Sequence, residues 1–170
     1  MIRMGSLPKS LMGAFARGAV LALTIAALGS VCLAQDAARV KAGLNVWKSA
    51  GCPDCHGPFA DGDKQVDEAP TGANLRTSRL DVEQLTETIR CGRPGTGMPA
   101  FDEGAYETRG CYGQPPGDRP DAMEPPPRTL SLAEINDVVV YLKARVMGRG
   151  RITAEECAAY YEDDDDASCP

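Results

Sequence analysis

The stretch AGCPDCHGPFADG, residues 50–62, holds two of the seven cysteines of the chain and its single histidine. Cys52, Cys55 and His56 form the pattern C-x-x-C-H. Closely spaced cysteine and histidine occur in structural zinc sites, in redox-active dithiols and at sites of covalent haem attachment. The residues around the pattern distinguish between these three kinds of site.

A structural zinc site needs four nitrogen or sulfur ligands, and this chain has no second histidine and no second pair of close cysteines. A thioredoxin-like dithiol follows a strand and opens a long helix, whereas here a helical pattern precedes the motif and a loop-like segment follows it. C-x-x-C-H is the attachment pattern of c-type haem, in which two thiols bond to the vinyl groups and the histidine becomes an axial ligand. We therefore predict one covalent haem c held by Cys52, Cys55 and His56.

The second axial ligand has three candidates after the N-terminal segment, namely Met98, Met123 and Met147. Met147 ends a predicted helix, and Met123 lies in a proline-rich segment. Met98 lies in the tight loop GTGMPAF, which Pro99 stiffens. We predict Met98 as the ligand. A thioether sulfur raises the reduction potential of the iron and fills its coordination sphere, which favours electron transfer.

Residues 1–34 have the composition of a secretory signal peptide. Three basic residues precede an uncharged apolar run at 19–34 that ends in small residues. The run is shorter than the ~20 residues of a transmembrane helix, so we expect cleavage after Ala34 and a periplasmic protein. Two alternatives stay open: an uncleaved membrane anchor, and lipidation at Cys32.

The charge of the chain is strongly acidic. Removal of the three basic residues of the signal peptide lowers the net charge from −6 to −9. Such a charge disfavours nucleic acid and anionic membranes as partners, and it fits attraction to a basic protein surface or simply solubility. Membrane association is expected only if the N-terminal segment is not cleaved.

Four cysteines remain once Cys32 and the motif are set aside, and an exported protein can pair them. Four cysteines allow three pairings, and the sequence alone does not decide between them. Pairing of nearest neighbours predicts the disulfides Cys91–Cys111 and Cys157–Cys169.

Helical spacing of apolar residues predicts helices at 36–49, 80–92 and 131–148. A capping box formed by Ser131 and Glu134 begins the third, and a second box at Thr153 predicts a short final helix. Residues 102–129 are rich in proline and irregular. We expect an all-α domain at 35–148, with 102–129 as an insert, followed by an acidic C-terminal extension at 149–170.

These features resemble the single-haem class I cytochromes c. The resemblance rests on the motifs CPDCHG and GTGMPAF and on the helix at 131–147. It covers residues 39–101 and 131–147. It implies a small cytochrome c fold of three to five helices around one haem, with a contact between Gly43 and Tyr141 where the terminal helices cross. Trp47 is similar to the aromatic residue that precedes the haem motif.

The family usually has a Gly-Pro-x-Leu turn whose carbonyl group binds Nδ1 of the ligand histidine. This chain has PTGANL, with Ala73 at the position of the proline, and Pro70 is an alternative provider. The origin of the carbonyl group therefore stays open.

The resemblance implies a one-electron carrier rather than an enzyme. The insert suggests a dedicated redox partner, and by analogy we expect a quinoprotein alcohol dehydrogenase as donor and an oxidase as terminal acceptor. The alternatives are a membrane-anchored haem subunit of a larger respiratory or dehydrogenase complex, and a haem enzyme or sensor with an open iron site.

Overall fold

The structure is a computed structural model that describes residues 36–163 and 169. The chain divides into two compact units, Met1–Ala38 and Arg39–Pro170. The expected signal peptide and its cleavage site lie outside the described residues, as do most residues of the acidic run at 163–166. Within the described ranges, no helix is both long and apolar enough to cross a membrane.

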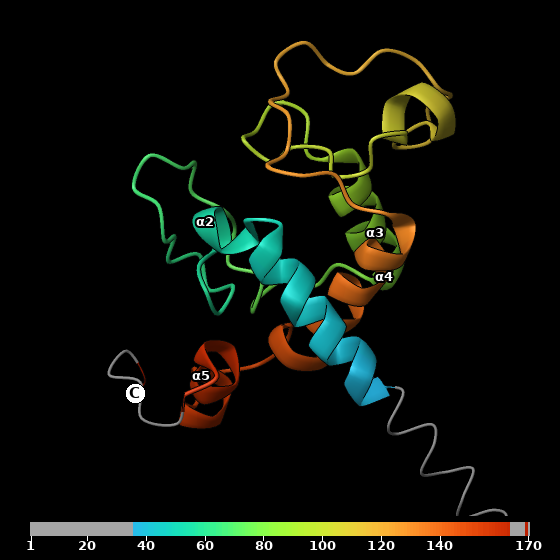
Figure 1. The fold of residues 1–170 in the computed structure, drawn as a ribbon. Helices are drawn as coiled ribbons and strands as arrows, with labels where there is room; N and C mark the ends of the chain where they lie inside the picture. Colours follow the sequence, from blue (N-terminus) through green and yellow to red (C-terminus); the bar gives the residue numbers. More distant parts are fainter. Residues whose placement is uncertain (1–35, 164–168, 170) are drawn as a thin grey trace, which may run out of the picture. The chain divides into compact units, whose positions relative to one another are not determined.

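The described residues form helices and no strands, which confirms the all-α fold class. An N-terminal helix is seen over residues 36–49. It is followed by the elements labelled in Figure 1, namely α2 (Cys52–His56), α3 (Val82–Cys91), α4 (Leu132–Tyr141) and α5 (Ala154–Tyr161). Two π-helical turns are present, η1 (Ala105–Arg109) inside the insert and η2 (Leu142–Val146), which continues α4.

Side-chain caps determine where the longer helices begin. Ser131 caps α4 and Thr153 caps α5, each through the predicted capping box. The same arrangement begins α3, where the Asp81 side chain accepts a hydrogen bond from the backbone of Gln84. The short helix α2 was not predicted; it follows Gly51, whose φ of 73° is in the left-handed region that favours glycine.

The N-terminal helix crosses α4 at Gly43. A Cβ atom at this position would lie 2.0 Å from the carbonyl oxygen of Asp137 and 2.7 Å from Cβ of Tyr141. The Gly43–Tyr141 contact that the resemblance implies is therefore present. One turn later, the rings of Trp47 and Tyr141 are 6.2 Å apart. Helix α3 packs against α4, so these three helices enclose the main core.

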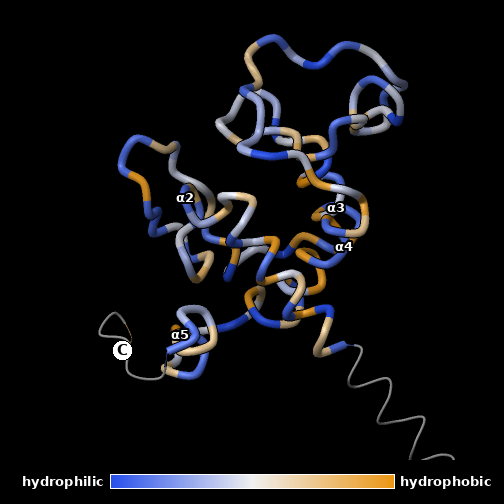
Figure 2. Tube along the Cα trace, viewed as in Figure 1, coloured by the Kyte–Doolittle hydropathy of each residue, from blue (hydrophilic) through white to orange (hydrophobic). Residues whose placement is uncertain are grey.

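The core is apolar and lies mostly on α3, α4 and the N-terminal helix. Figure 2 shows apolar residues on α4, whereas the outer part of the insert is mainly hydrophilic or neutral. The largest side chains with almost no exposure include Trp47, Ile135, Val138, Leu142 and Val146. Burial of these side chains supplies the main driving force for folding.

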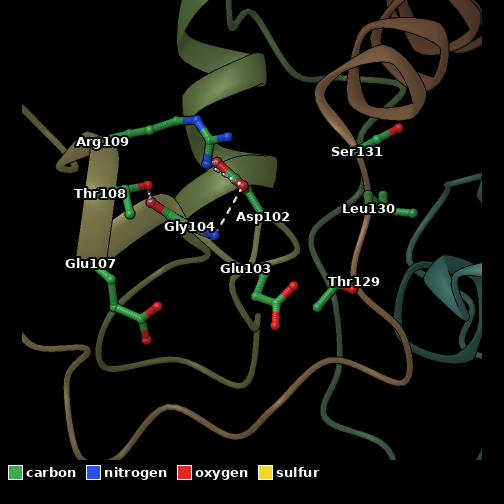
Figure 3. A pocket seen from close by; sticks show the side chains of 9 residues that line it. All are labelled: Asp102, Glu103, Gly104, Glu107, Thr108, Arg109, Thr129, Leu130 and Ser131. Atoms are coloured by element: carbon green, nitrogen blue, oxygen red, sulfur yellow. Dashed lines mark hydrogen bonds and ion pairs between the residues drawn. The ribbon is translucent and has the colours of Figure 1, made fainter.

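The insert has a small core of its own. The disulfide Cys91–Cys111 joins the end of α3 to the insert, and Ala105 packs beside it. Asp102 is buried and accepts hydrogen bonds from Arg109 and from the backbone of Gly104, as Figure 3 shows. These contacts hold the first part of the insert against α3.

The C-terminal extension also packs against the rest of its unit. The disulfide Cys157–Cys169 closes the segment that contains α5. The ring of Tyr160 is 5.5 Å from Phe59, which lies in the loop after the haem motif. The Lys48 ammonium group lies over the Tyr160 ring, 4.7 Å from its centroid. Both disulfides of the structure are those that pairing of nearest neighbours predicts.

Candidate haem-binding cavity

A cavity of about 1060 Å³ lies among α2, α3, α4 and the loops that join them. Its volume is close to the upper end of the range typical for bound cofactors, about 300–1,000 Å³. Apolar side chains from three elements form its walls, including Leu85, Ile89, Val138 and Leu142. A second pocket of about 540 Å³, drawn in Figure 3, lies between η1 and the start of α4 and contains none of the predicted haem residues.

The four residues predicted to hold a haem all line the larger cavity: Cys52, Cys55, His56 and Met98. The two motif cysteines are free, whereas the other four cysteines of the described residues are paired in disulfides. Neither Met123 nor Met147 lines the cavity. The structure thus brings the predicted set together and separates Met98 from the two competing methionines.

His56 is held by the backbone of the loop that follows it. Its Nδ1–H group donates a hydrogen bond to the carbonyl oxygen of Ala73, at 2.8 Å. The carbonyl group therefore comes from the alanine at the proline position of the turn, not from Pro70. Gly72 permits this approach, because a Cβ atom there would lie 2.6 Å from Nδ1 of His56. Since Nδ1 is occupied, Nε2 is the nitrogen available to a metal.

Burial of the imidazole lowers the pKa of His56, and the bond to Ala73 opposes this shift without cancelling it. The ring is therefore neutral at pH 7, which is the form that binds iron. A hydrogen bond from Nδ1 also fixes the tautomer and raises the basicity of the ligating nitrogen. The environment of His56 is thus suited to an axial ligand.

The two motif thiols are not in an environment that favours thiolate. Desolvation raises the pKa of Cys52 to about 12 and also raises that of Cys55. Redox-active cysteines react as thiolates and have lowered pKa values. In addition, no group of three or more histidine, cysteine, aspartate or glutamate side chains suited to a metal ion occurs in the described part of the chain. The raised thiol pKa values disfavour the dithiol interpretation.

The loop that carries Met98 folds back on the end of α3. Arg93 donates its backbone N–H to the carbonyl of Met98 at 3.0 Å, and Phe101 donates to the carbonyl of Ile89 at 3.2 Å. Gly92 makes the turn with a φ of 66°, and a Cβ atom there would lie 2.5 Å from the backbone of Pro99. The position of Met98 therefore depends on a loop that is bonded at both of its ends.

Trp47 provides a separate test of whether a cofactor fits. The residue lines the cavity, and its indole Nε1 is buried and has no hydrogen-bond partner among the described residues. Its ring centroid is 6.0 Å from that of His56. A buried N–H group without a partner costs free energy. Apolar walls, two free thiols, an oriented imidazole, a thioether and this unpaired donor together fit a haem c.

The insert forms part of the cavity wall, which the sequence analysis did not predict. Tyr112, Glu124 and Pro127 line the cavity. The hydroxyl group of Tyr112 donates to the carbonyl of Gly92, and its backbone N–H donates to Glu87 at 2.7 Å. The sequence offers two signals for this contact, the triple proline at 125–127 and Tyr112 next to Cys111. Neither signal indicates which part of the chain the residue contacts.

Residues 38–108 match the family model described as "Cytochrome C oxidase, cbb3-type, subunit III". The matched range is less than half of the 170 residues, and it includes the C-x-x-C-H motif and Met98. The match supports a c-type cytochrome domain that binds haem c covalently and acts in electron transfer. No curated protein and no solved structure matches the chain.

Proposed function

We propose that this protein is a periplasmic one-electron carrier with a single covalent haem c and His/Met ligation. The observation that supports the proposal best is that Cys52, Cys55, His56 and Met98 line one cavity. Haem iron supplies the chemistry, which is the reversible uptake and release of one electron. The chain sets the conditions for that exchange.

Each residue of the site has a separate task. Cys52 and Cys55 would form the thioether bonds that keep the cofactor in place. His56 would bind the iron through Nε2, with its ring held by Ala73. Met98 would fill the sixth position, which raises the potential and leaves no place for oxygen or peroxide. The apolar walls would exclude water from a bound haem and so lower the reorganisation energy of the electron exchange.

An absorption spectrum of the protein as purified, oxidised and reduced, tests this ligation. We expect a sulfur-to-iron charge-transfer band in the near infrared of the oxidised protein. The band should be lost in Met98→Ala and retained in Met123→Ala, the matched control, because Met123 does not line the cavity. A high-spin spectrum without the band, or ready binding of carbon monoxide by the reduced wild type, would instead support a haem enzyme or sensor.

The expected partners are other redox proteins, with a quinoprotein alcohol dehydrogenase as donor and an oxidase as acceptor. The support is analogy and position: Tyr112 and Glu124 of the insert line the cavity and are exposed, so a docking partner would meet them. The acidic net charge favours a partner with a basic face. Stopped-flow reduction by a purified quinoprotein dehydrogenase at several salt concentrations tests this. Fast reduction that slows as salt rises supports it, and no reduction refutes this donor.

A second candidate is a haem subunit of a membrane-bound complex, anchored by an uncleaved segment at 19–34. The description of the matching family, an oxidase subunit, favours it. The two candidates differ in the N-terminus of the native protein. N-terminal sequencing after fractionation of cells is expected to find Gln35 in the periplasmic fraction; Met1 in the membrane fraction would support the subunit.

A further inference from the structure

Arg76 is a buried charged residue outside the cavity. Its side chain is 6% exposed, and it lies three residues after Ala73. Among the described residues, its side-chain hydrogen bonds lead to the C-terminal extension and to the loop after the haem motif. A buried guanidinium group is retained only where charges and carbonyl groups compensate its desolvation.

The extension supplies most of that compensation. Nε of Arg76 donates to the carbonyl of Gly150 at 3.0 Å, and Nη2 donates to Oε2 of Glu156 at 3.0 Å. The backbone adds a further bond, because Gly148 donates its N–H to the carbonyl of Arg76 at 2.9 Å. On the other side, Nη1 donates to the carbonyl of Phe59 at 3.4 Å. One side chain thus joins two segments that are distant in sequence.

The segment that Arg76 binds is itself fixed. Glu156 lies in the first turn of α5 and also accepts the backbone N–H of Thr153 in the capping box. The disulfide Cys157–Cys169 ties α5 to a residue 12 positions later, and the ring of Tyr160 packs on Phe59. The described part of the extension around α5 is therefore an anchor for Arg76.

A tight turn connects Arg76 to the carbonyl group that holds His56. The Asn74 side chain accepts the backbone N–H groups of Arg76, at 2.9 Å, and of Thr77, at 3.3 Å. Ala73 immediately precedes this turn. A shift of Arg76 would consequently move the Ala73 carbonyl, which lies 2.8 Å from Nδ1 of His56.

We propose that Arg76 is a positioning residue: by fastening the turn at 73–76 to the C-terminal extension, it holds the Ala73 carbonyl on His56 and so adjusts the reduction potential of the haem. The inference rests on the proposed function, because it requires His56 to be an iron ligand. The extension then has a role in tuning the centre, beyond the general stabilisation that its disulfide provides.

The sign of the potential change separates positioning from simple electrostatics. A bond from Nδ1 makes the imidazole a stronger donor, which stabilises ferric iron and lowers the potential. If Arg76→Ala weakens that bond, the potential rises. If Arg76 acts only through its charge, the loss of a positive charge favours ferric iron and the potential falls. Glu156→Gln keeps an acceptor for Arg76, so positioning predicts little change, whereas electrostatics predicts a rise.

The experiment measures two quantities on the purified haem protein: the midpoint potential, and the rate at which the Nδ1 proton of His56 exchanges with deuterium in the reduced state, followed by NMR. We expect Arg76→Ala to raise the potential and to accelerate exchange on the order of tenfold. Arg149→Ala is the matched control, because Arg149 is an exposed arginine of the same segment. It should change neither quantity appreciably.

The double variant Cys157→Ser/Cys169→Ser tests the anchor without altering the charge. It also replaces Arg76→Ala as the test if that variant does not fold. It should also raise the potential and speed exchange. Unchanged exchange in both variants would overturn the proposal, because the backbone bonds from Gly72 to Cys55 and from Leu75 to Ala60 would then suffice to hold the loop. Failure of the proposed function itself would be visible in the wild type, as a spectrum without His56 ligation.

Discussion

Gly43 lies so close to Asp137 that the two helices meet through backbone atoms. A Cβ atom on Gly43 would be 2.0 Å from the carbonyl oxygen of Asp137, a distance that no rearrangement of side chains can relieve. The same close approach places Trp47 beside Tyr141 and lets its indole ring reach the cavity. The helix crossing therefore positions one wall of the haem site.

Replacement of Gly43 by alanine should destabilise the protein, because the helices must move apart. Overpacking typically costs about 1–3 kcal/mol, and the better helix propensity of alanine returns about 1 kcal/mol of this at most. Urea unfolding of the haem-containing protein measures the difference. Gly150→Ala is the control, because a Cβ atom there meets nothing within 4 Å. Equal stability of the two variants would refute the close contact.

The features predicted correctly from the sequence depend on residues that lie within a few positions of one another. The capping boxes at Ser131 and Thr153 begin helices through contacts between residues three positions apart. The motif at Cys52–His56 is equally short, and the family match supports the haem c that it predicts. The crossing at Gly43 is long-range, but a family resemblance indicated it. The capping box at Asp81 was missed although its signal, glutamine three residues later, is present.

The contacts that were not predicted join segments that are distant in the sequence and that have no periodic pattern of apolar residues. Arg76 and Glu156 form an ion pair across 80 positions, and neither residue differs in type from the exposed charges around it. Tyr112 is similar: it lies in an irregular segment and reaches the cavity through a φ of 55°, which non-glycine residues seldom adopt. Such placements follow from tertiary packing, which single-sequence patterns do not describe.

The capping box of α4 should make stability depend on acidic pH. Hydrogen bonds from the Ser131 backbone and from Arg128 hold the pKa of Glu134 at about 2, below its ordinary value of 4.5. Because the folded-state pKa is lowered, the stabilisation is complete above pH 4.5 and is lost as the pH falls through 2. The group is exposed, so we expect less than about 1 kcal/mol.

Glu134→Gln removes the titration but leaves an acceptor for the capping box. Between pH 4.5 and 2, the free energy of unfolding should fall less steeply for this variant than for the wild type. Glu155→Gln, which removes an exposed acid from the first turn of α5, controls for the loss of charge. Parallel curves for Glu134→Gln and the wild type would show that the capping carboxylate contributes nothing in this range.

Asp102 is expected to be the most sensitive charged residue of the insert. Its carboxylate is buried between Arg90, at 3.3 Å, and Arg109, at 2.9 Å. Asp102→Asn leaves the two guanidinium groups without their counter-ion, and breaking a buried pair costs about 3 kcal/mol. Asp137→Asn breaks the more exposed pair with Arg39 and should cost less than about 1 kcal/mol. Urea unfolding measures the loss of unfolding free energy in both variants. Equal losses would show that water readily hydrates Asp102.

The disulfide Cys91–Cys111 should matter for the Met98 side of the haem as well as for stability. It joins residues 20 positions apart, and its loss through Cys91→Ala/Cys111→Ala should cost about 3 kcal/mol. Cys91 precedes Gly92, which begins the Met98 loop, and Cys111 precedes Tyr112, which donates to the Gly92 carbonyl. A freed insert should therefore loosen Met98.

Carbon monoxide binding by the reduced protein measures that loosening, because the gas can bind only when the sixth position is vacated. We expect faster and tighter binding in Cys91→Ala/Cys111→Ala. The control is Cys157→Ala/Cys169→Ala, which removes a disulfide of separation 12 from the extension and should lower stability by a similar amount, about 3 kcal/mol. That bond anchors the His56 side and not the Met98 loop, so carbon monoxide binding should increase much less than in Cys91→Ala/Cys111→Ala. Equal gains in both variants would mean that general destabilisation, rather than the tie to the insert, releases Met98.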